Sequence, residues 1–476
     1  MRKVLLAKSA GFCFGVRRAV KLAQEIAAAP ENRHLRHQTE RLYLAKISTV
    51  HAFCAQLLRS YAFQRNLSAD ARVADEAECS VLRQRAMERV LEEAYGNLEA
   101  EPAIRAFLDT QGFGRDDRVV PEIVASLYDA SQCHLDPGKW LEDCVQQARF
   151  DGQDPGDTVW GQYLLQQYRR ELEGCAAQLE RMLAVCGQWE DLNQKYAPQI
   201  RRELEDIRAC QAHTTWREMR EHPVSFGRLS PLRSPQSPDD AACVKAVRTA
   251  CKERLTRQQE VFQLDEGQAV ADLQQSAQAV EGLVKLTKSF AAAFRAEKEK
   301  RRVLDFSDLE HETLALLYQR GSTEITGAAR EIGRQFREVL VDEYQDTNAV
   351  QDSIFAALTR ERGNCFLVGD VKQSIYRFRL ADPGIFLEKY RQFVPAAQAQ
   401  AGQGRKILLS ENFRSGGEIL EAANWVFGCC MYPEVGGLRY GPEESLREGV
   451  AHEALPTCAV ELHGIQLEQD AQGRTA

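Results

Sequence analysis

Two adjacent acids, Asp342 and Glu343, follow a short apolar run in the segment VLVDEYQDTN, residues 339–348. Short β-branched runs of this kind are typical of buried strands in a parallel sheet. At the carboxyl end of such a strand one carboxylate can hold Mg²⁺ on a nucleotide while its neighbour orients or deprotonates the attacking water. We therefore predict that Asp342 binds the metal and Glu343 serves as the base. A solvated strand end is the competing interpretation.

A second segment whose residue types could bind a ligand is FLVGDVKQSIYRFR, residues 366–379. It predicts another strand and a glycine turn, followed by Gln373 and then by Tyr376 and Phe378 in alternation with arginines. Bases stack on aromatic rings while guanidinium groups meet phosphates, so this alternation favours contact with a single-stranded nucleic acid. An ordinary turn with surface arginines is the alternative.

The elements that must position these residues are of two kinds, predicted strands and a long helical region. Three apolar runs, 338–343, 364–370 and 406–413, predict buried parallel strands, and the segment 47–61 begins extended and becomes helical. Residues 62 to about 300 have helical periodicity. Breaks are expected near 154–157 and 223–238, an extended or disordered loop over 222–240, and one or two exposed helices over 254–302.

Composition sets the class of protein. The chain has 476 residues, 44% hydrophobic and 27% charged, which is typical of soluble proteins and predicts two or three domains. It contains no apolar run near the roughly 20 residues of a membrane span, so we expect no membrane partner. Basic residues interrupt the apolar stretch at the start of the sequence, which argues against a secretory signal, so we expect a cytoplasmic protein. The fourteen cysteines lack a CxxC pair and are expected to be reduced thiols. A net charge of −8 does not exclude a local groove for nucleic acid.

Several motifs occur in a fixed order along the chain. They are ISTVHAFC, LDFSDL, VLVDEYQDTN, FLVGDVKQSIYRFRLADPGIFLEKY and LSENFRS. Together they resemble the UvrD/RecB family of superfamily-one DNA helicases, and within it the helicase-nuclease subunits of the AddA type, over roughly residues 29–476. The resemblance implies an ATP- and Mg²⁺-dependent DNA helicase acting in double-strand break repair and recombination. It also implies single- or double-stranded DNA as substrate and, as partner, an AddB-type subunit.

The resemblance assigns nucleotide-site roles to five residues. Asp342 and Glu343 correspond to the Walker B pair, with Mg²⁺ on Asp342. Gln345 would support the phosphate site, and Gln373 would couple the γ-phosphate to the DNA site. Arg414 corresponds to the arginine finger, whose permanent charge can stabilise the transferring phosphoryl group.

The resemblance also assigns DNA contacts. Thr49 and His51 would touch the strand, Tyr376 and Phe378 would stack on bases, and Arg379 would join them. Two further acids of the motif LDFSDL, Asp305 and Asp308, are expected to be structural.

The phosphate-binding loop of this family, GxxxxGK[ST], does not occur in the sequence. The only Gly-Lys step, Gly138 and Lys139, is followed by Trp140 and lacks the earlier glycine. Loss of several preorganised donors would leave negligible turnover, because a single such donor is worth about 10²- to 10³-fold in rate. We therefore expect a chain of helicase type that is inactive by itself.

Residues 1–28 resemble instead the start of IspH, the iron-sulfur diphosphate reductase of isoprenoid synthesis. In that family the cysteine of AGFCFGV, here Cys13, is a cluster ligand. No cysteine of this chain precedes proline, as a further ligand of that family does, so we expect no cluster at Cys13. The alternatives to a helicase chain are thus a reductase, supported by 28 residues, and a non-catalytic module that binds DNA or a partner.

The predicted fold is α/β, an incomplete RecA-like P-loop NTPase parallel sheet interrupted by a large all-α insertion. The expected parts are the leader 1–28, a remnant of the first motor domain at 29–61, the helical insertion 62–300 with its Pro-rich loop 222–240, the rest of the first motor domain at 301–415, and a truncated second motor domain at 416–476.

Overall fold

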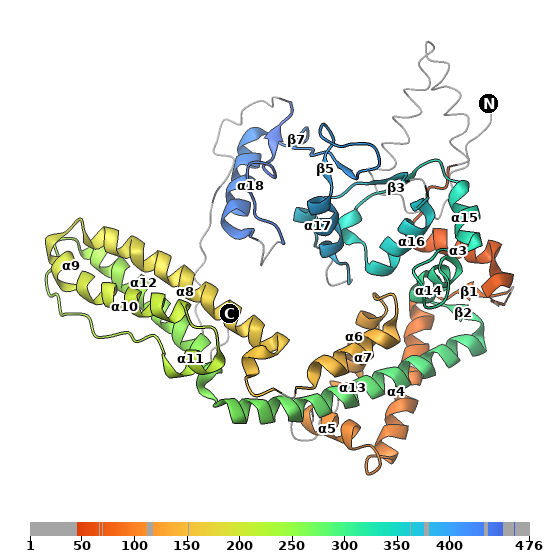
Figure 1. Ribbon diagram of the computed structural model, residues 1–476, viewed down its shortest axis with the longest axis horizontal. Helices are drawn as coiled ribbons and strands as arrows, with labels where there is room; N and C mark the ends of the chain where they lie inside the picture. Colours follow the sequence, from red (N-terminus) through yellow and green to blue (C-terminus); the bar gives the residue numbers. More distant parts are fainter. Residues whose placement is uncertain are drawn as a thin grey trace. The chain divides into compact units, whose positions relative to one another are not determined.

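The structure is a computed structural model that describes residues 45–65, 67–68, 70–111, 118–150, 152–361, 363–375, 380–432, 437–450 and 461. It divides into two compact units (Figure 1). Unit 1 contains the chain up to Ser80, residues 132–135 and the chain from Lys298 onward, and unit 2 contains Val81–Ser131 and Asp136–Glu297. None of the described helices combines the length and the apolar character needed to cross a bilayer.

Unit 1 holds the parallel strands. Its helices are α3 (Val50–Ser60), α14 (Phe306–Leu317), α15 (Gly327–Arg334), α16 (Ala349–Thr359), α17 (Pro383–Gln392) and α18 (Gly417–Cys430). Its strands form four parallel pairs: β1 (Arg72–Val73) with β2 (Val303–Leu304), β3 (Val339–Val341) with β4 (Cys365–Leu367), β5 (Val394–Pro395) with β6 (Arg405–Lys406), and β7 (Glu411–Asn412) with β8 (Arg447–Glu448). The described chain is thus mostly helical with small parallel strand pairs, which is consistent with an α/β class.

The strands at 338–343 and 364–370 are confirmed as β3 and β4, but their predicted burial is wrong, because the residues of each strand are either exposed or only half-buried. Leu340 is 73% exposed and Phe366 is 51% exposed, and these two residues are paired across the strands. Strands of parallel sheets are normally covered on both faces. Among the described residues β3 and β4 pair only with each other, and the exposure of Leu340 and Phe366 shows that no described element covers these two side chains.

The prediction of a third buried strand over 406–413 is also wrong. Only Lys406 and the pair Glu411–Asn412 are in strands, and Ile407 and Leu409 between them are largely exposed. An apolar run specifies a strand only where a partner strand and a covering layer accept it.

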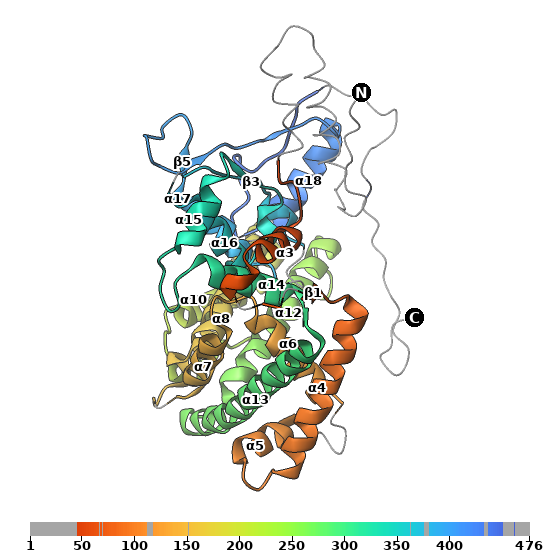
Figure 2. The ribbon, with the colours of Figure 1, turned by 90° about the vertical axis from the view of Figure 1, so that its right-hand side faces the viewer.

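The core of unit 1 is formed by four helices, α3, α14, α15 and α16. Cys54, Leu58, Leu317, Ile332 and Ile354 are buried against one another there. Figure 2 shows α3, α14 and α16 grouped together, as Figure 1 does. The helix predicted within 47–61 is confirmed, since Thr49 ends the extended stretch and its hydroxyl accepts the backbone N–H of Ala52. This core supports the residues of the candidate site.

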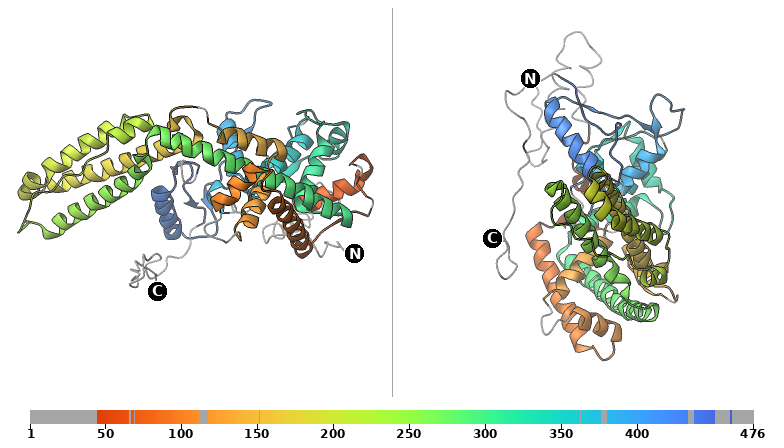
Figure 3. Two further views of the ribbon diagram at one scale, coloured as in Figure 1. Left: turned by 90° about the horizontal axis from the view of Figure 1, so that it is seen from below. Right: turned by 90° about the vertical axis from the view of Figure 1, so that its left-hand side faces the viewer.

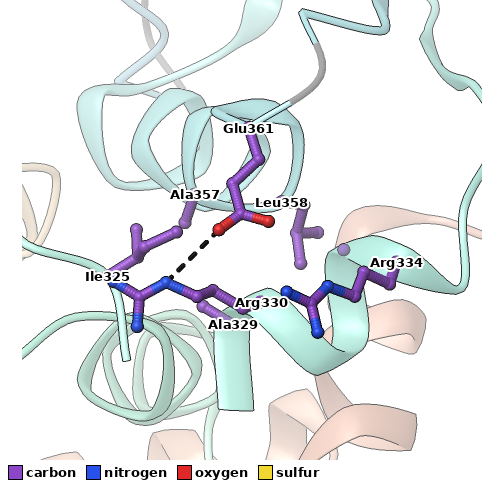
Figure 4. Close-up of a pocket in the computed structure, with 8 residues that line it drawn as sticks. Ile325, Ala329, Arg330, Arg334, Ala357, Leu358 and Glu361 are labelled. Carbon is purple, nitrogen blue, oxygen red and sulfur yellow. Dashed lines mark ion pairs between the residues drawn. The ribbon is translucent and has the colours of Figure 1, made fainter. Parts of the chain in front are cut away.

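Residues of α15 and α16 line a small pocket where the two helices meet (Figure 4). Arg330 of α15 pairs with Glu361 at 3.3 Å, beside a small hollow lined by both helices. A Cβ built on Gly333 would lie 2.6 Å from the backbone oxygen of Leu358, which is closer than real Cβ atoms approach. Because the obstructing atom belongs to the backbone, a side chain at 333 must push the two helices apart.

Gly333→Ala is therefore expected to destabilise unit 1 by about 1 to 3 kcal/mol through overpacking. The matched control is Gly327→Ala on the same helix, where a Cβ meets nothing within 4 Å and alanine is the better helix former. The unfolding of unit 1 can be followed by the extent to which the buried thiol of Cys54 is alkylated at increasing urea concentrations, measured by mass spectrometry of the peptide that contains it. An equal effect of both substitutions would show that the contact with Leu358 is not what limits this position.

Unit 2 is helical. Besides the crossing helices α4 (Glu76–Gly96) and α13 (Glu266–Arg301), which begin or end in unit 1, it contains α5 (Pro102–Gln111), α6 (Val120–Ser131), α7 (Pro137–Ala148), α8 (Val159–Cys186), α9 (Glu190–Lys195), α10 (Ala197–Gln211), α11 (Trp216–Glu221) and α12 (Pro238–Gln259). Figure 3 shows α8, α10 and α12 running side by side. The helical periodicity of this region predicted its structure correctly.

Two details of unit 2 refine the predictions. The Pro-rich segment between α11 and α12 contains no helix or strand, as expected, but its Val224, Phe226 and Leu229 pack against the bundle core. The expectation of exposed helices over 254–302 is wrong for α13, because Phe290 and Phe294 are fully buried. Large aromatic side chains on one face of a long helix provide apolar area that folding removes from water.

Candidate functional site

The acid pair lies at the carboxyl end of β3, as the sequence predicts. The backbone N–H of Val368 donates to the carbonyl of Val341 at 2.9 Å, and the N–H of Tyr344 returns to the carbonyl of Val368 at 2.9 Å. The loops that follow β3 and β4 are thereby held side by side. Asp342 and Glu343 both lie at this edge, where ligands of parallel sheets bind.

Glu343 has a left-handed backbone, with φ 49° and ψ 42°. This conformation is uncommon for residues with a Cβ and concentrates at functional sites. Its N–H donates to Oδ1 of Asp342 at 3.0 Å. The turn therefore leaves the second carboxylate oxygen of Asp342 for a ligand, since no protein partner for it is found within the described residues.

Gln345 joins the two loops. It is buried, its Nε2 donates to the Glu343 carboxylate at 2.7 Å, and its Oε1 accepts the backbone N–H of Asp370 at 3.0 Å. The orientation of the amide is fixed by chemistry, because a carboxylate only accepts and a backbone N–H only donates. A Cβ on Gly369 would lie 2.7 Å from Oε1 of Gln345 and 3.2 Å from the backbone nitrogen of Gln345, so a side chain at this position would displace the Gln345 amide.

Asp370 extends the same chain of hydrogen bonds. Its carboxylate accepts Nε2 of Gln373 at 3.0 Å and pairs with Nζ of Lys372 at 2.8 Å. Gln373 thus reaches Gln345 through Asp370 and not directly. Asp370 was not among the predicted site residues, although its place as the acid ending the run NCFLVGD was the available signal.

His51 lies on α3 and makes two side-chain contacts. Its Nε2 is 2.9 Å from Oε1 of Glu310, and its ring stacks on Phe306 with centroids 4.4 Å apart. Thr49 is exposed and uses its hydroxyl oxygen to cap α3. His51 is therefore held against α14, whereas Thr49 lies at the surface and caps α3.

Glu310 is a buried acid that sequence reasoning missed. Besides His51, its carboxylate accepts Nε2 of Gln351 at 2.7 Å and Nδ2 of Asn348 at 3.3 Å. Burial pushes the pKa of Glu310 upward, but the hydrogen bonds from His51, Gln351 and Asn348 together outweigh it and leave the pKa below its ordinary value. The only signal in the sequence was its position on the same helix face as Thr313 and Leu317.

The lowered pKa of Glu310 predicts an acid-dependent contribution to stability. A carboxyl whose folded-state pKa lies below its unfolded value stabilises the fold above the unfolded value, and this is lost as the pH falls through the folded-state pKa. The difference in the free energy of unfolding between the wild type and Glu310→Gln should therefore be constant near neutral pH. It should shrink as the pH falls below 4.5, the ordinary pKa of a glutamate. Hydrogen exchange of α14 peptides across this range measures it, and a pH-independent difference would contradict the assignment.

The remaining predicted residues are less connected. Arg414 is exposed after β7, and its backbone N–H donates to Oδ1 of Asn412 at 2.9 Å. Within the described chain no interaction joins Arg414 to the acid pair. Tyr376, Phe378, Arg379 and Cys13 lie outside the described residues, so their predicted roles stay predictions.

Asp305 and Asp308 have the structural role that was expected of them. Each side chain accepts the backbone N–H of the other residue, which caps α14 at its first turn. Both carboxylates also pair with the buried ammonium of Lys298, at 2.8 and 2.6 Å. The cap fixes the start of the helix that carries Phe306 and Glu310.

The donor set at the end of β3 fits a magnesium nucleotide. Mg²⁺ prefers carboxylate oxygens and is held by one or two of them, together with phosphates and water. Asp342 offers such an oxygen, and Glu343 lies next to it. No cluster of three or more potential ligands occurs among the described residues, and a nucleotide-bound metal does not require one.

Comparisons with known proteins place this arrangement in context. The family model of the UvrD/REP helicase N-terminal domain matches residues 16–394. The chain is 35% identical over 469 residues to an ATP-dependent helicase/nuclease subunit from Pelotomaculum thermopropionicum, covering 94% of this chain and 36% of that protein. The subunit of the same name from Geobacillus thermodenitrificans is 36% identical over 444 residues, covering 90% and 35%. The chain spans about a third of the length of these relatives.

Proposed function

Because this chain belongs to the UvrD/REP helicase family, we propose that it is the part of an ATP-dependent DNA helicase motor that supplies the acid pair of the ATP site. The strands β3 and β4 are then part of a RecA-like sheet, and the helical unit 2 is an insertion within that motor domain. The relatives, which are named as ATP-dependent helicase/nuclease subunits, favour a machine of this kind. The motif resemblance to AddA-type subunits adds the proposal that its substrate is DNA and that it acts in double-strand break repair.

One observation carries the proposal. Asp342 and Glu343 follow the end of a parallel strand, and Gln345 ties Glu343 to Asp370 at the end of the next strand. In this arrangement Asp342 holds Mg²⁺ and Glu343 orients the attacking water, while Gln345 keeps the Glu343 carboxylate in one place. When bound, Mg²⁺ neutralises the charge that develops on the phosphates.

Two further residues are proposed for the same site. The guanidinium of Arg414 is exposed and permanently charged, which suits contact with the transferring phosphoryl group. Gln373 donates a hydrogen bond to Asp370 and closely precedes Tyr376 and Phe378 in the sequence, so it is the candidate to couple the nucleotide site to the proposed base-stacking residues. The chain thus contains candidates for both nucleotide and strand contacts.

We also propose that the 476-residue chain does not hydrolyse ATP by itself. The phosphate-binding loop GxxxxGK[ST] does not occur in the sequence, and its amides and lysine normally hold the phosphates that Asp342 and Glu343 act on. Because each preorganised donor is worth about 10²- to 10³-fold in rate, an acid pair without the loop leaves negligible turnover.

Magnesium-dependent ATPase activity of the purified chain tests this, measured with and without single-stranded DNA beside Glu343→Gln. The expected result is no turnover above that of Glu343→Gln under either condition. Turnover that DNA stimulates and that Glu343→Gln abolishes would support the acid pair and contradict the proposed inactivity. Anisotropy of a labelled oligothymidylate, measured on the same preparation, tests the DNA role independently of ATP.

A partner protein is a second proposal, favoured by the word subunit in the relatives' names. An AddB-type protein should co-purify with the chain when the two are expressed together. A chain that elutes alone at all ratios of the two proteins would argue against this partner.

A further inference from the structure

Glu310 is a buried carboxylate that no step of the proposed nucleotide chemistry uses. It lies on α14 and accepts hydrogen bonds from three side chains: His51 on α3, Asn348 just before α16, and Gln351 on α16. Burying a charge is costly unless donors surround it, and here three donors do so. The cluster therefore joins three separate elements of unit 1 through a single side chain.

The chemistry of the carboxylate determines the state of the His51 ring. A carboxylate in this environment only accepts hydrogen bonds, so Nε2 of His51 must carry a proton. The other nitrogen, Nδ1, has no protein partner within the described part of the chain and is left for a ligand. Stacking on Phe306 restricts the tilt of the ring, so both its orientation and its tautomer are defined.

The other two donors connect this ring to the acid pair. Asn348 ends the segment that begins at β3 and contains Asp342, and its Oδ1 caps α16 by accepting the N–H of Gln351 at 2.8 Å. Its Nδ2 donates to Oε2 of Glu310. The same asparagine thus fixes the start of α16 and the carboxylate that holds His51.

We propose that Glu310 is a positioning residue for strand binding, which holds His51 with Nδ1 available to single-stranded DNA and ties that ring to the segment following the acid pair. The inference rests on the proposed DNA-binding function. Glu310 itself touches neither nucleotide nor strand. It holds the His51 ring in one tautomer and one orientation before DNA binds, so binding does not have to pay for ordering the ring.

The test uses the full chain and a fluorescein-labelled oligothymidylate, with binding followed by anisotropy. Glu310→Gln keeps the size of the side chain but removes the charge and presents an amide N–H₂ to one of the three donors. It is expected to weaken binding about tenfold, as loss of a charged hydrogen-bond acceptor does. The matched control is Glu312→Gln on the same helix, which removes only the partially exposed pair with Arg65 and should change the affinity less than about twofold.

A double-mutant cycle separates positioning from a general loss of structure. In a His51→Ala background, Glu310→Gln should have little further effect on affinity, because the ring that Glu310 positions is already gone. If both substitutions lower the affinity independently, so that their effects multiply, the inference is overturned. Gln351→Met, which removes another donor to the same carboxylate without changing charge, provides a milder variant and should weaken binding by a smaller factor in the same direction.

The state of the ring can be measured without DNA. In ¹⁵N-histidine-labelled protein, with the signal assigned through His51→Gln, the wild-type ring should show a protonated Nε2, and Glu310→Gln should show a mixture of tautomers. A wild-type chain that does not bind the oligonucleotide overturns the proposed DNA function and this role with it. A wild type that binds, with Glu310→Gln binding equally well, overturns the positioning role alone.

Discussion

Replacing Arg248 with alanine is expected to destabilise unit 2 by about 3 to 5 kcal/mol, because it leaves a fully buried carboxylate without its cation. Nε of Arg248 donates to Glu203 at 2.9 Å, and the amide of Gln199 donates to the same carboxylate at 3.0 Å. The guanidinium also donates to the carbonyl of Gly227 and stacks on Phe226. It therefore holds the Pro-rich loop against α10 and α12.

Tryptophan fluorescence in urea measures this effect, because Trp189 and Trp216 lie in or against the core of unit 2. The control is Arg208→Ala, which breaks an exposed pair between Arg208 and Glu180 and should change stability by about 0 to 1 kcal/mol. Limited proteolysis should cleave the loop in Arg248→Ala before the bundle unfolds. Similar urea midpoints for the two variants would mean that the buried pair does not hold unit 2 together.

Lys298→Met is expected to destabilise unit 1 by a similar amount, about 3 to 5 kcal/mol. The buried ammonium pairs with both Asp305 and Asp308, and methionine keeps the alkyl chain while removing the charge. Burial and the neighbouring Asp305 already raise the pKa of Asp308. Without Lys298 the two carboxylates face each other in a desolvated cap, and the first turn of α14 loses its support.

The sign of the pH dependence distinguishes this mechanism from a simple packing defect. A carboxyl whose folded-state pKa is raised supports stability at low pH and loses that support as the pH rises through the folded-state pKa. The deficit of Lys298→Met should therefore be largest at neutral pH and smaller in acid. Hydrogen exchange of α14 peptides at neutral and at acidic pH measures this loss of stability. The control is Lys285→Met, which changes an exposed lysine on α13, the helix that also carries Lys298. A deficit that does not change with pH would indicate lost packing alone.

These two ion pairs matter for function to different degrees. Lys298 supports the cap of α14, and α14 carries Phe306 and Glu310, so its loss should also disturb His51. Arg248 lies in unit 2, and its loss should leave the hydrogen bonds around Glu343 and Gln345 in unit 1 intact. Oligonucleotide anisotropy on both variants, at temperatures where each is folded, compares the two expectations.

Sequence patterns predicted the positions of several local elements well, although not the burial of the strands. The strand before Asp342, the strand before Asp370 and the helix after Thr49 all form as expected, because apolar spacing and a capping hydroxyl are local signals. The third strand failed at Ile407 and Leu409, since an apolar run becomes a strand only when a partner pairs with it.

By itself, the sequence determined the family and the chemical types available: an acid pair after a strand, a histidine at the start of a helix and a permanently charged arginine. Those properties depend on residue identity and short spacing, which folding does not alter. Tertiary structure decided how the residues are connected. It placed Gln345 between Glu343 and Asp370, and it buried Glu310 under donors from elements far apart in the chain. Such contacts depend on how whole helices and strands pack together, and a local sequence pattern therefore cannot predict them.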